Sequence, residues 1–334
     1  MELDLPLIWA GLIAFAILAY VILDGFDLGI GILFPLFEGD LRRDQAMNTV
    51  APIWDGNETW LVLGGGGLFA VFPLAYAVIL PALYAPIMAM LFGLVFRGVA
   101  FEFRWRTSRW KAAWDFSFFI GSLVATLAQG ITLGALIQGI DVDGRAYAGG
   151  WWDWLTPFSL ICGVALVIGY SLLGATWLIL KTDGWVRHRA YDIAFLAALA
   201  MMAAMAVVSL WTPFLDAKFM QRWFSMPSLY YVAVVPLLTF GLFVGLFTAL
   251  KTRKDHLPFL YSVGLFVACY IGLGINLFPH IVPPHITIWQ AAGPDSSLAF
   301  LLAGAVVLLP VILGYTAYSY WVFRGKTQLD EGYH

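Results

Sequence analysis

The chain has 334 residues, of which 61% are hydrophobic and 12% are charged, and its mean hydropathy is +0.84. Soluble domains are closer to half apolar and a quarter charged, so this composition indicates a polytopic membrane protein. The net charge of -3 gives no sign of a nucleic-acid partner or of a polybasic lipid-binding tail. The acidic start, MELDLP, lacks the positive segment of a cleaved signal peptide.

Long apolar segments follow one another along the whole chain. A spanning helix needs roughly 20 mostly apolar residues. We expect spans at about 6–36, 50–72, 75–103, 113–140, 156–180, 188–211, 227–250, 257–277 and 298–323. No low-complexity linker separates a soluble domain, so residues 1–334 are predicted to form one all-α integral membrane domain with about nine transmembrane helices.

Lysine and arginine are divided unequally between the two sides of these spans. The odd-numbered loops and the C-terminus hold 14 of the 18 residues, whereas the even-numbered loops hold Arg145, Lys218 and Arg222. Arg97 lies inside the third span. Because loops rich in lysine and arginine stay cytoplasmic, we expect the N-terminus outside and the C-terminus in the cytoplasm. An error of one helix would mix the two sets, so the division also supports nine spans.

The first span carries two acids in the sequence VILDGFDLGIGIL. Asp24 and Asp27 are three residues apart and share one helix face with Gly31. Gly25 and Gly29 form a GxxxG pair on roughly the opposite face, where a second helix can approach closely. An ionisable group at the bilayer centre costs about 3 kcal/mol on insertion scales. We therefore expect both acids to face protein or a hydrated cavity.

Further ionisable residues lie at the predicted cytoplasmic ends of the second, third and fourth spans. The second span begins APIWDGNETWLVLGGGGLF, and its four consecutive glycines are costly in a helix unless another element packs closely against them. With the two acids of the first span, we expect one cytoplasmic-side cluster of six carboxylates and one arginine: Asp24, Asp27, Asp55, Glu58, Glu102, Asp115 and Arg97.

Two interpretations of this cluster stay open. It is an ion-paired network that holds the helices together, with Arg97 neutralising one or two acids, or it is a proton-uptake path. The acids of the second span also suit a capping role, because a helix N-terminus favours carboxylates. Six acids against one intramembrane base exceed what pairing alone requires, so we favour the proton path for the cluster as a whole.

Histidine and cysteine residues limit the cofactor chemistry of the chain. None of the five histidines lies in the middle of a span, where a haem ligand is expected. His280 and His285 are five residues apart across two prolines, a weak pattern for a metal site. Cys162 and Cys269 lie inside apolar spans and are read as small hydrophobic residues. We expect neither a cofactor nor a metal to be ligated by this chain.

Several motifs resemble subunit II of cytochrome bd-type ubiquinol oxidase, including its cyanide-insensitive branch. The most specific are LDGFDLGIGIL and APIWDGNETWLVLGGGGLFAVFP, followed by FRGVAFEFR and WDFSFFIGS. Weaker agreement continues through PFSLICG, GATWLILKT and FPHIVPPHITIWQAA, so the resemblance covers essentially the whole chain. It implies two four-helix bundles, at 1–140 and 156–277, and a peripheral ninth helix at 298–323.

The resemblance also implies an activity and partners. The complex oxidises quinol at the outer face, reduces dioxygen to water and takes its protons from the cytoplasm, which separates charge without a pump. Two b haems and one d haem are ligated by subunit I, and a small single-helix accessory subunit can be present. The other expected partners are ubiquinol and the lipids of a bacterial inner membrane, without nucleic acid.

Residue roles follow from the matched motifs. Asp24 and Asp27 match the family's DGFD acids, Asp55 and Asn57 match WDGN, and Trp60 follows at a place suited to dioxygen entry. The proposed proton pathway comprises Asp24, Asp27, Asp55, Asn57, Glu58 and Asp115, of which Asp115 matches the acid of a WD pair. Arg97 and Glu102 are expected to give ion-pair support. Gln290 stands where the family more often has an aspartate, which leaves the role of the last outer loop open.

Two alternatives belong to other functional classes. A proton-coupled secondary transporter suits intramembrane acids and glycine-rich helices, but it predicts an inverted repeat. The acids of spans one to four have no counterpart in spans five to nine. The second alternative is a purely structural scaffold that supports a catalytic partner and takes no part in its chemistry.

Overall fold

Long helices account for most of the protein, whose computed structural model describes residues 3–107, 109–226 and 228–328. Within these residues, eight helices are long and apolar enough to cross a membrane, and the bent pair Trp54–Val71 and Pro73–Ala82 brings the number to nine when its two pieces count as one span. The prediction of nine spans is confirmed. The long helices are α1 (Leu5–Leu33), α3 (Trp54–Val71), α5 (Tyr84–Phe103), α6 (Lys111–Gln138), α7 (Pro157–Lys181), α8 (Gly184–Trp211), α11 (Val234–Lys251), α12 (Leu257–Leu277) and α14 (Asp295–Val322).

The predicted boundaries of the third span are wrong. The segment expected as one helix at 75–103 is divided into α4 (Pro73–Ala82) and α5. Helix α4 bends by 119° from α3, and α5 then crosses the membrane. Proline opens α4 at Pro73, and Leu83 leaves the helical backbone region with φ -114° and ψ 23°. A proline cannot donate a backbone hydrogen bond to the preceding turn, which explains why α3 ends just before Pro73.

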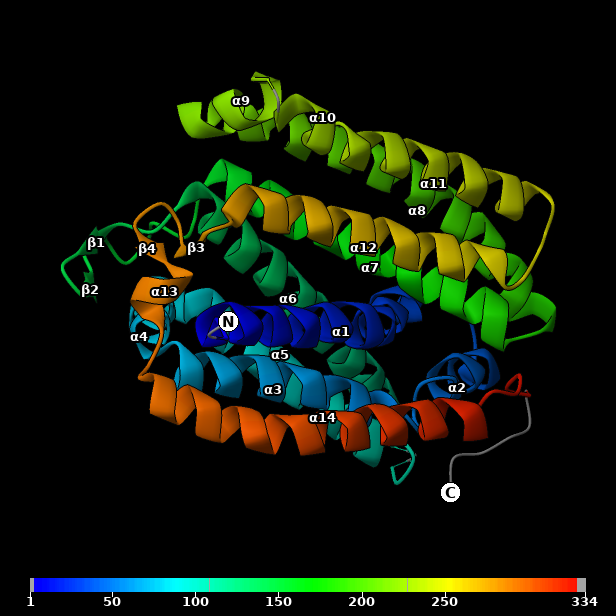
Figure 1. The fold of residues 1–334 in the computed structure, drawn as a ribbon. Helices are drawn as coiled ribbons and strands as arrows, with labels where there is room; N and C mark the ends of the chain where they lie inside the picture. Colours follow the sequence, from blue (N-terminus) through cyan, green and yellow to red (C-terminus); the bar gives the residue numbers. More distant parts are fainter. Residues whose placement is uncertain (1–2, 108, 227, 329–334) are drawn as a thin grey trace.

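Short elements lie at both ends of the long helices. At one end are α2 (Asp40–Asn48) and the last turn of α14, and at the other are α4, α9 (Ala217–Phe224), the short helix α13 (Ile288–Ala291) and two antiparallel hairpins (Figure 1). The hairpins pair β1 with β2 and β3 with β4. Their strands are β1 (Val142–Asp143), β2 (Ala146–Tyr147), β3 (His280–Val282) and β4 (Ile286–Thr287). The remaining elements are η1 (Phe34–Leu36), η2 (Thr212–Phe214) and α10 (Ser228–Val232).

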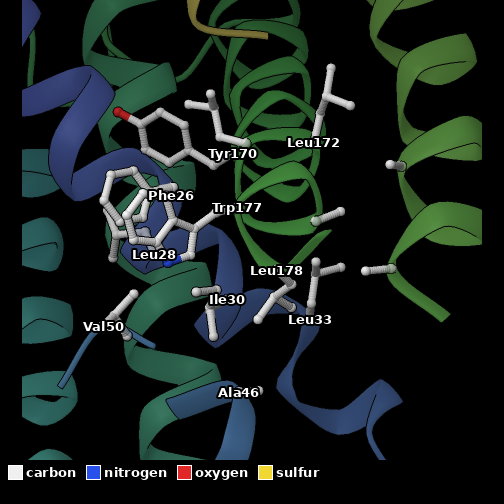
Figure 2. Packing of buried hydrophobic residues seen from close by; sticks show 14 of the residues in the cluster. Phe26, Leu28, Ile30, Leu33, Ala46, Val50, Tyr170, Leu172, Trp177 and Leu178 are labelled. Carbon is white, nitrogen blue, oxygen red and sulfur yellow. The ribbon is translucent and has the colours of Figure 1, made fainter. Parts of the chain in front are cut away.

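Helix α1 lies in the centre and packs against α3, α6 and α7 (Figure 1). A Cβ atom on Gly29 would lie 1.9 Å from the carbonyl oxygen of Tyr170, and one on Gly174 would lie 2.6 Å from the carbonyl carbon of Gly29. The backbones of α1 and α7 therefore touch, which confirms the close approach predicted from the GxxxG pair. One turn away, Phe26 of α1 stacks on Trp177 of α7 with ring centroids 4.2 Å apart (Figure 2).

Four consecutive glycines in α3 divide between two faces of that helix. Cβ atoms on Gly64 and Gly67 would lie 3.2 and 3.1 Å from Ile17 and Ile13 of α1, whereas Gly65 and Gly66 have open space around them. Half of this glycine run therefore serves the α1–α3 contact within the subunit. The division of the chain into bundles at 1–140 and 156–277 stays a prediction, because α7 packs against both α1 and α6.

Candidate functional site

A buried arginine on α5 joins acids from two other helices. Arg97 Nη2 lies 2.7 Å from Asp24 Oδ1 of α1 and 2.9 Å from Glu58 Oε2 of α3. The side chains of Arg97 and Asp24 are fully buried, and that of Glu58 is 27% exposed. Together with Asp27 and Asn57, these residues form what we call the Arg97 cluster. Arg97 therefore lies within ion-pair distance of two acids, and its role as the cation that neutralises them stays a prediction.

Asn57 connects the second acid of α1 to the last helix. Its side-chain nitrogen donates to Asp27 Oδ2 at 2.8 Å and to the Leu23 carbonyl at 3.2 Å. Its side-chain oxygen accepts from the hydroxyl of Tyr320 of α14, also at 2.8 Å. A cleft of about 30 Å³ reaches Asn57 between the start of α3 and α14, large enough for a water molecule. The amide of Asn57 thus has its two ends fixed by different helices.

Local sequence explains how the three helices bring these groups together. Asp24 and Asp27 share one face of α1, while Asn57 and Glu58 lie in the first turns of α3. Arg97 follows Gly93 by one turn of α5. A Cβ atom on Gly93 would lie 2.6 Å from the Gly121 carbonyl oxygen, so α5 and α6 touch there and hold the arginine close to α1.

A second polar chain starts one turn from Asp24 along α1. Gln129 of α6 donates to the hydroxyl of Tyr20 at 2.6 Å and accepts from the hydroxyl of Tyr170 of α7 at 3.0 Å. Tyr20 precedes Asp24 by four residues and shares its helix face. Tyr20, Gln129 and Tyr320 are not among the site residues predicted from the sequence. A tyrosine one turn from Asp24 and a glutamine in mid-span were the available signals for the first two.

Asp115 lies in a separate ion-paired group at the end of the bundle near α2. Its two carboxylate oxygens bind Arg104 at 2.5 Å and Arg43 at 2.9 Å. Arg104 also binds Asp44 of α2 at 2.6 Å, and Lys111 lies 3.3 Å from the same Asp44. We call these five residues the Asp115 cluster. They tie α2 to the ends of α5 and α6.

A row of aromatic rings lies between the two clusters and separates them. Trp54 lies 5.8 Å from the Arg97 guanidinium and stacks on Phe101, which contacts Phe118 edge-on. Phe118 in turn contacts Phe34, whose ring lies 5.3 Å from the Arg104 guanidinium. The prediction of one cluster of six acids is therefore wrong, because Asp115 has its own pair of guanidinium partners beyond these rings.

Two further acids of the predicted cluster are exposed. Glu102 lies on the last turn of α5 and pairs with Arg106 at 3.5 Å, so the expectation that it supports the Arg97 cluster is wrong. On a helix with 3.6 residues per turn, five positions rotate Glu102 to a different face from Arg97. Asp55 lies on the exposed side of the first turn of α3, three residues before Glu58.

Trp60 is buried between α1 and α14. Its side chain is 2% exposed, its ring contacts Phe15 edge-on at 5.8 Å, and Tyr20 belongs to the same apolar cluster. Leu309 and Ile312 of α14 cover this cluster from the other side. Trp60 is thus one turn from Asn57 along α3 but in apolar surroundings.

The family model for cytochrome bd terminal oxidase subunit II matches residues 5–323. This chain belongs to that family. Cytochrome bd-I ubiquinol oxidase subunit 2 of Escherichia coli (strain K12) is 33% identical, and the alignment covers 98% of this chain and 96% of that protein. Cytochrome bd ubiquinol oxidase subunit 2 of Bacillus subtilis (strain 168) is 29% identical, with 97% of both chains covered.

A solved structure supports the fold of subunit II. The structure of bd oxidase from Geobacillus thermodenitrificans matches with a TM-score of 0.77 over 96% of this chain and 99% of that chain, at 17% identity. Subunit II is accordingly a multi-pass membrane component of a bd-type terminal oxidase, a quinol oxidase complex that contains haem and a subunit I. The membership supports the oxidase interpretation over the transporter alternative.

The histidines of the described residues lie away from the middle of the spans. They lie at helix ends or in the last hairpin: His188 near the start of α8, His256 just before α12, His280 in β3, and His285 just before β4. Burial, together with the nearby Lys218 and Arg222, lowers the pKa of His280. No group of three metal-binding side chains occurs in the part of the chain that the structure describes.

Proposed function

We propose that subunit II supplies protons from the cytoplasm to the oxidase through the Arg97 cluster. The observation that carries this proposal is the number of charges: one buried guanidinium contacts Asp24 and Glu58, while Asp27 beside them is bound by the amide of Asn57. A buried ion is costly unless it is paired. One cation can neutralise one of three carboxylates, so the others must be protonated or solvated by water. Carboxyl groups in such a setting can take up and release protons.

The proposed path enters at the start of α3. Asp55 is exposed there and Glu58, on the next turn, is partly exposed, whereas Asp24 is fully buried. We order them as Asp55 first, Glu58 second and Asp24 third, with Arg97 between the last two. Asp27 and Asn57 form a branch beside the small cleft. In the proposed orientation, with the C-terminus in the cytoplasm, this entry lies on the proton-supplying side.

For Asp115 we propose a structural role. Two guanidinium groups bind its two oxygens, so its charge is already balanced, unlike that of the Arg97 cluster. Removing one partner of a buried ion pair is strongly destabilising because the other charge stays unpaired. Asp115 therefore holds α2 and α6 together, and we take it out of the proton path that its motif suggested.

At the level of the complex, we propose the arrangement that the sequence resemblance implied. The two b haems and the d haem are ligated by subunit I, quinol is oxidised at the outer face, and dioxygen is reduced to water. The Escherichia coli and Bacillus subtilis relatives are both named as ubiquinol oxidase subunits, which supports ubiquinol as the substrate. For dioxygen we propose entry along the apolar contacts of Trp60 between α3 and α14.

Substitution of the acids in the assembled complex tests the proton path. Asp27→Asn and Glu58→Gln keep the side-chain size but remove the proton-accepting group, so we expect oxygen consumption to fall at least about tenfold. The haem absorption spectrum of the purified two-subunit complex should stay unchanged. Glu38→Gln is the control, because Glu38 is exposed outside the spans.

Turnover equal to that of the wild type in haem-replete Asp27→Asn and Glu58→Gln complexes would contradict this function. Such a result would favour the scaffold alternative, in which subunit II only supports subunit I. Loss of haem in the variants but not in the control would point to the same alternative, since the acids would then serve assembly.

A further inference from the structure

An open groove runs along α8 on the side of the molecule away from the Arg97 cluster. Its volume is about 370 Å³, and Leu36 of η1 lines it beside residues of α7 and α8. Its walls are apolar along most of their length, with a hydroxyl from Ser171 that bonds within its own helix. The other lining residues are Val167, Ile168, Arg189, Asp192, Ile193, Leu196, Ala197 and Ala200.

The length of the groove matches one leaflet of a bilayer. Along α8 it extends from Arg189 to Ala200, eleven residues of helix or about 16 Å. Half of a hydrocarbon core is about 15 Å thick. Trp185, one turn before Arg189, is 39% exposed, and its ring lies under the Arg42 guanidinium. Exposed tryptophans are enriched at the level of the lipid headgroups. The groove thus begins at the headgroup level and ends near the middle of the membrane.

Two opposite charges lie at the mouth of the groove without protein partners. Neither Arg189 nor Asp192 forms an ion pair or a side-chain hydrogen bond with any residue that the structure describes. Two neighbouring charges at this end of the bundle do have partners: Arg187 binds Asp255 at 2.6 Å and Lys326 binds Asp183 at 2.7 Å. An unpaired carboxylate close to the hydrocarbon region is costly, so a cationic group of a bound molecule would be favoured beside Asp192.

We propose that this groove binds one phospholipid with an amine-bearing, zwitterionic headgroup. The phosphate accepts hydrogen bonds from the guanidinium of Arg189, the ammonium group pairs with Asp192, and one acyl chain lies along the apolar walls. An anionic headgroup without an amine satisfies Arg189 but leaves Asp192 unpaired beside a second negative charge. In the proposed orientation of the chain, this lipid lies in the cytoplasmic leaflet. The rest of the lipid proposal does not depend on that orientation or on the proposed proton path.

Lipid analysis of the intact two-subunit complex tests this proposal. We expect delipidated wild-type complex, supplied with phosphatidylethanolamine and phosphatidylglycerol of identical acyl chains, to retain the first lipid about three- to tenfold more strongly by native mass spectrometry. Asp192→Asn should abolish this preference but keep phosphate binding, whereas Arg189→Gln should weaken retention of both lipids. Lys254→Gln, an exposed lysine at the same end, is the control.

Each outcome decides the proposal. Equal retention of both lipids by the wild type, or an unchanged preference in Asp192→Asn, overturns it. Stronger retention of phosphatidylglycerol by the wild type overturns it in favour of an anionic lipid. Quinone that is bound to the wild-type complex and lost from Asp192→Asn would also overturn it, because the groove would then bind quinone. Turnover serves as the check that all variants are assembled, because neither residue belongs to the Arg97 cluster.

Discussion

The side-chain amide of Asn57 is oriented by a residue 263 positions away. Tyr320 donates to its oxygen, so its nitrogen must face Asp27 and donate to that carboxylate. Without the tyrosine hydroxyl, the amide could rotate and turn its oxygen toward the acid. Tyr320 is therefore a positioning residue for the acid of α1, and it makes the proposed branch of the proton path depend on α14.

We predict that Tyr320→Phe lowers oxygen consumption by the haem-replete complex about two- to tenfold, the equivalent of one lost hydrogen bond. Because the hydroxyl acts through Asn57 on Asp27, the pH profile of turnover should shift as well. Tyr318→Phe is the matched control, since Tyr318 lies on the exposed side of the same helix. Equal pH profiles for Tyr320→Phe and the control would show that the hydroxyl has no such role.

Gln290 has a structural role at the start of a short helix. Its side-chain oxygen accepts from the backbone nitrogen of Thr287 at 2.9 Å, and the Thr287 hydroxyl accepts in return from the Gln290 backbone. This reciprocal capping starts the short helix α13. Glutamine serves a capping box as well as an acid does, so the residue has a structural reason that requires no negative charge.

Among the elements, α1 depends most on close backbone contact. It carries the acids of the Arg97 cluster on one side and touches α7 through Gly29 on another. Nothing but hydrogen fits at Gly29, because the neighbouring backbone cannot move as the end of a side chain can. The position of Asp24 and Asp27 relative to Arg97 therefore rests on the α1–α7 contact as well.

We predict that Gly29→Ala destabilises the complex by about 1–3 kcal/mol or more, because its Cβ would overlap the Tyr170 carbonyl. The measurement is the thermal unfolding of the detergent-solubilised complex, together with its haem content. Gly11→Ala on the same helix is the control, since no atom lies within 4 Å of a Cβ placed there. Equal melting temperatures for the two variants would contradict a tight α1–α7 contact.

On the scale of the whole molecule, residues 324–328 tie the last helix to the rest of the chain. This C-terminal strap places Lys326 against Asp183 and Asp255, while the Thr327 backbone binds the Lys181 carbonyl at 2.8 Å. Although burial acts in the opposite direction, hydrogen bonds from Arg187, Tyr191 and Lys326 lower the pKa of Asp255. The strap keeps α14, which is otherwise mostly exposed, beside α3.

We predict that Asp255→Asn destabilises the complex by about 1 kcal/mol at neutral pH. A carboxyl group whose pKa is lowered by folding stabilises the protein above its unfolded pKa of about 4. This contribution is lost as the pH falls through the lower, folded value. The difference in melting temperature between wild type and variant should therefore be present at pH 7 and decrease below about pH 4. A difference independent of pH would show that Asp255 acts by packing alone.

Much of the fold could be predicted because lipid limits what a spanning segment can be. Nine spans follow from apolar length alone, since every backbone polar group in a bilayer must be satisfied within a helix. The break between α4 and α5 was missed because both pieces are equally apolar, so composition does not separate them. Pro73, which opens α4, and Pro81, inside α4, were the local signals. The angle between α3 and α4 was decided by packing, because buried residues of α4 form one apolar cluster with residues of β3 and β4.

The candidate site shows the same division between sequence and tertiary structure. By itself the sequence determined that Asp24, Asp27, Glu58 and Arg97 lie inside the membrane, because helical periodicity and span length place them there. Which acids meet Arg97 was decided by the rotation of α3, α5 and α6 about their axes and by the aromatic rings between two clusters. The position of a residue along a span gives its depth in the bilayer, but only helix packing decides toward which neighbours its side chain points. This direction separates Asp115 and Glu102 from the acids around Arg97.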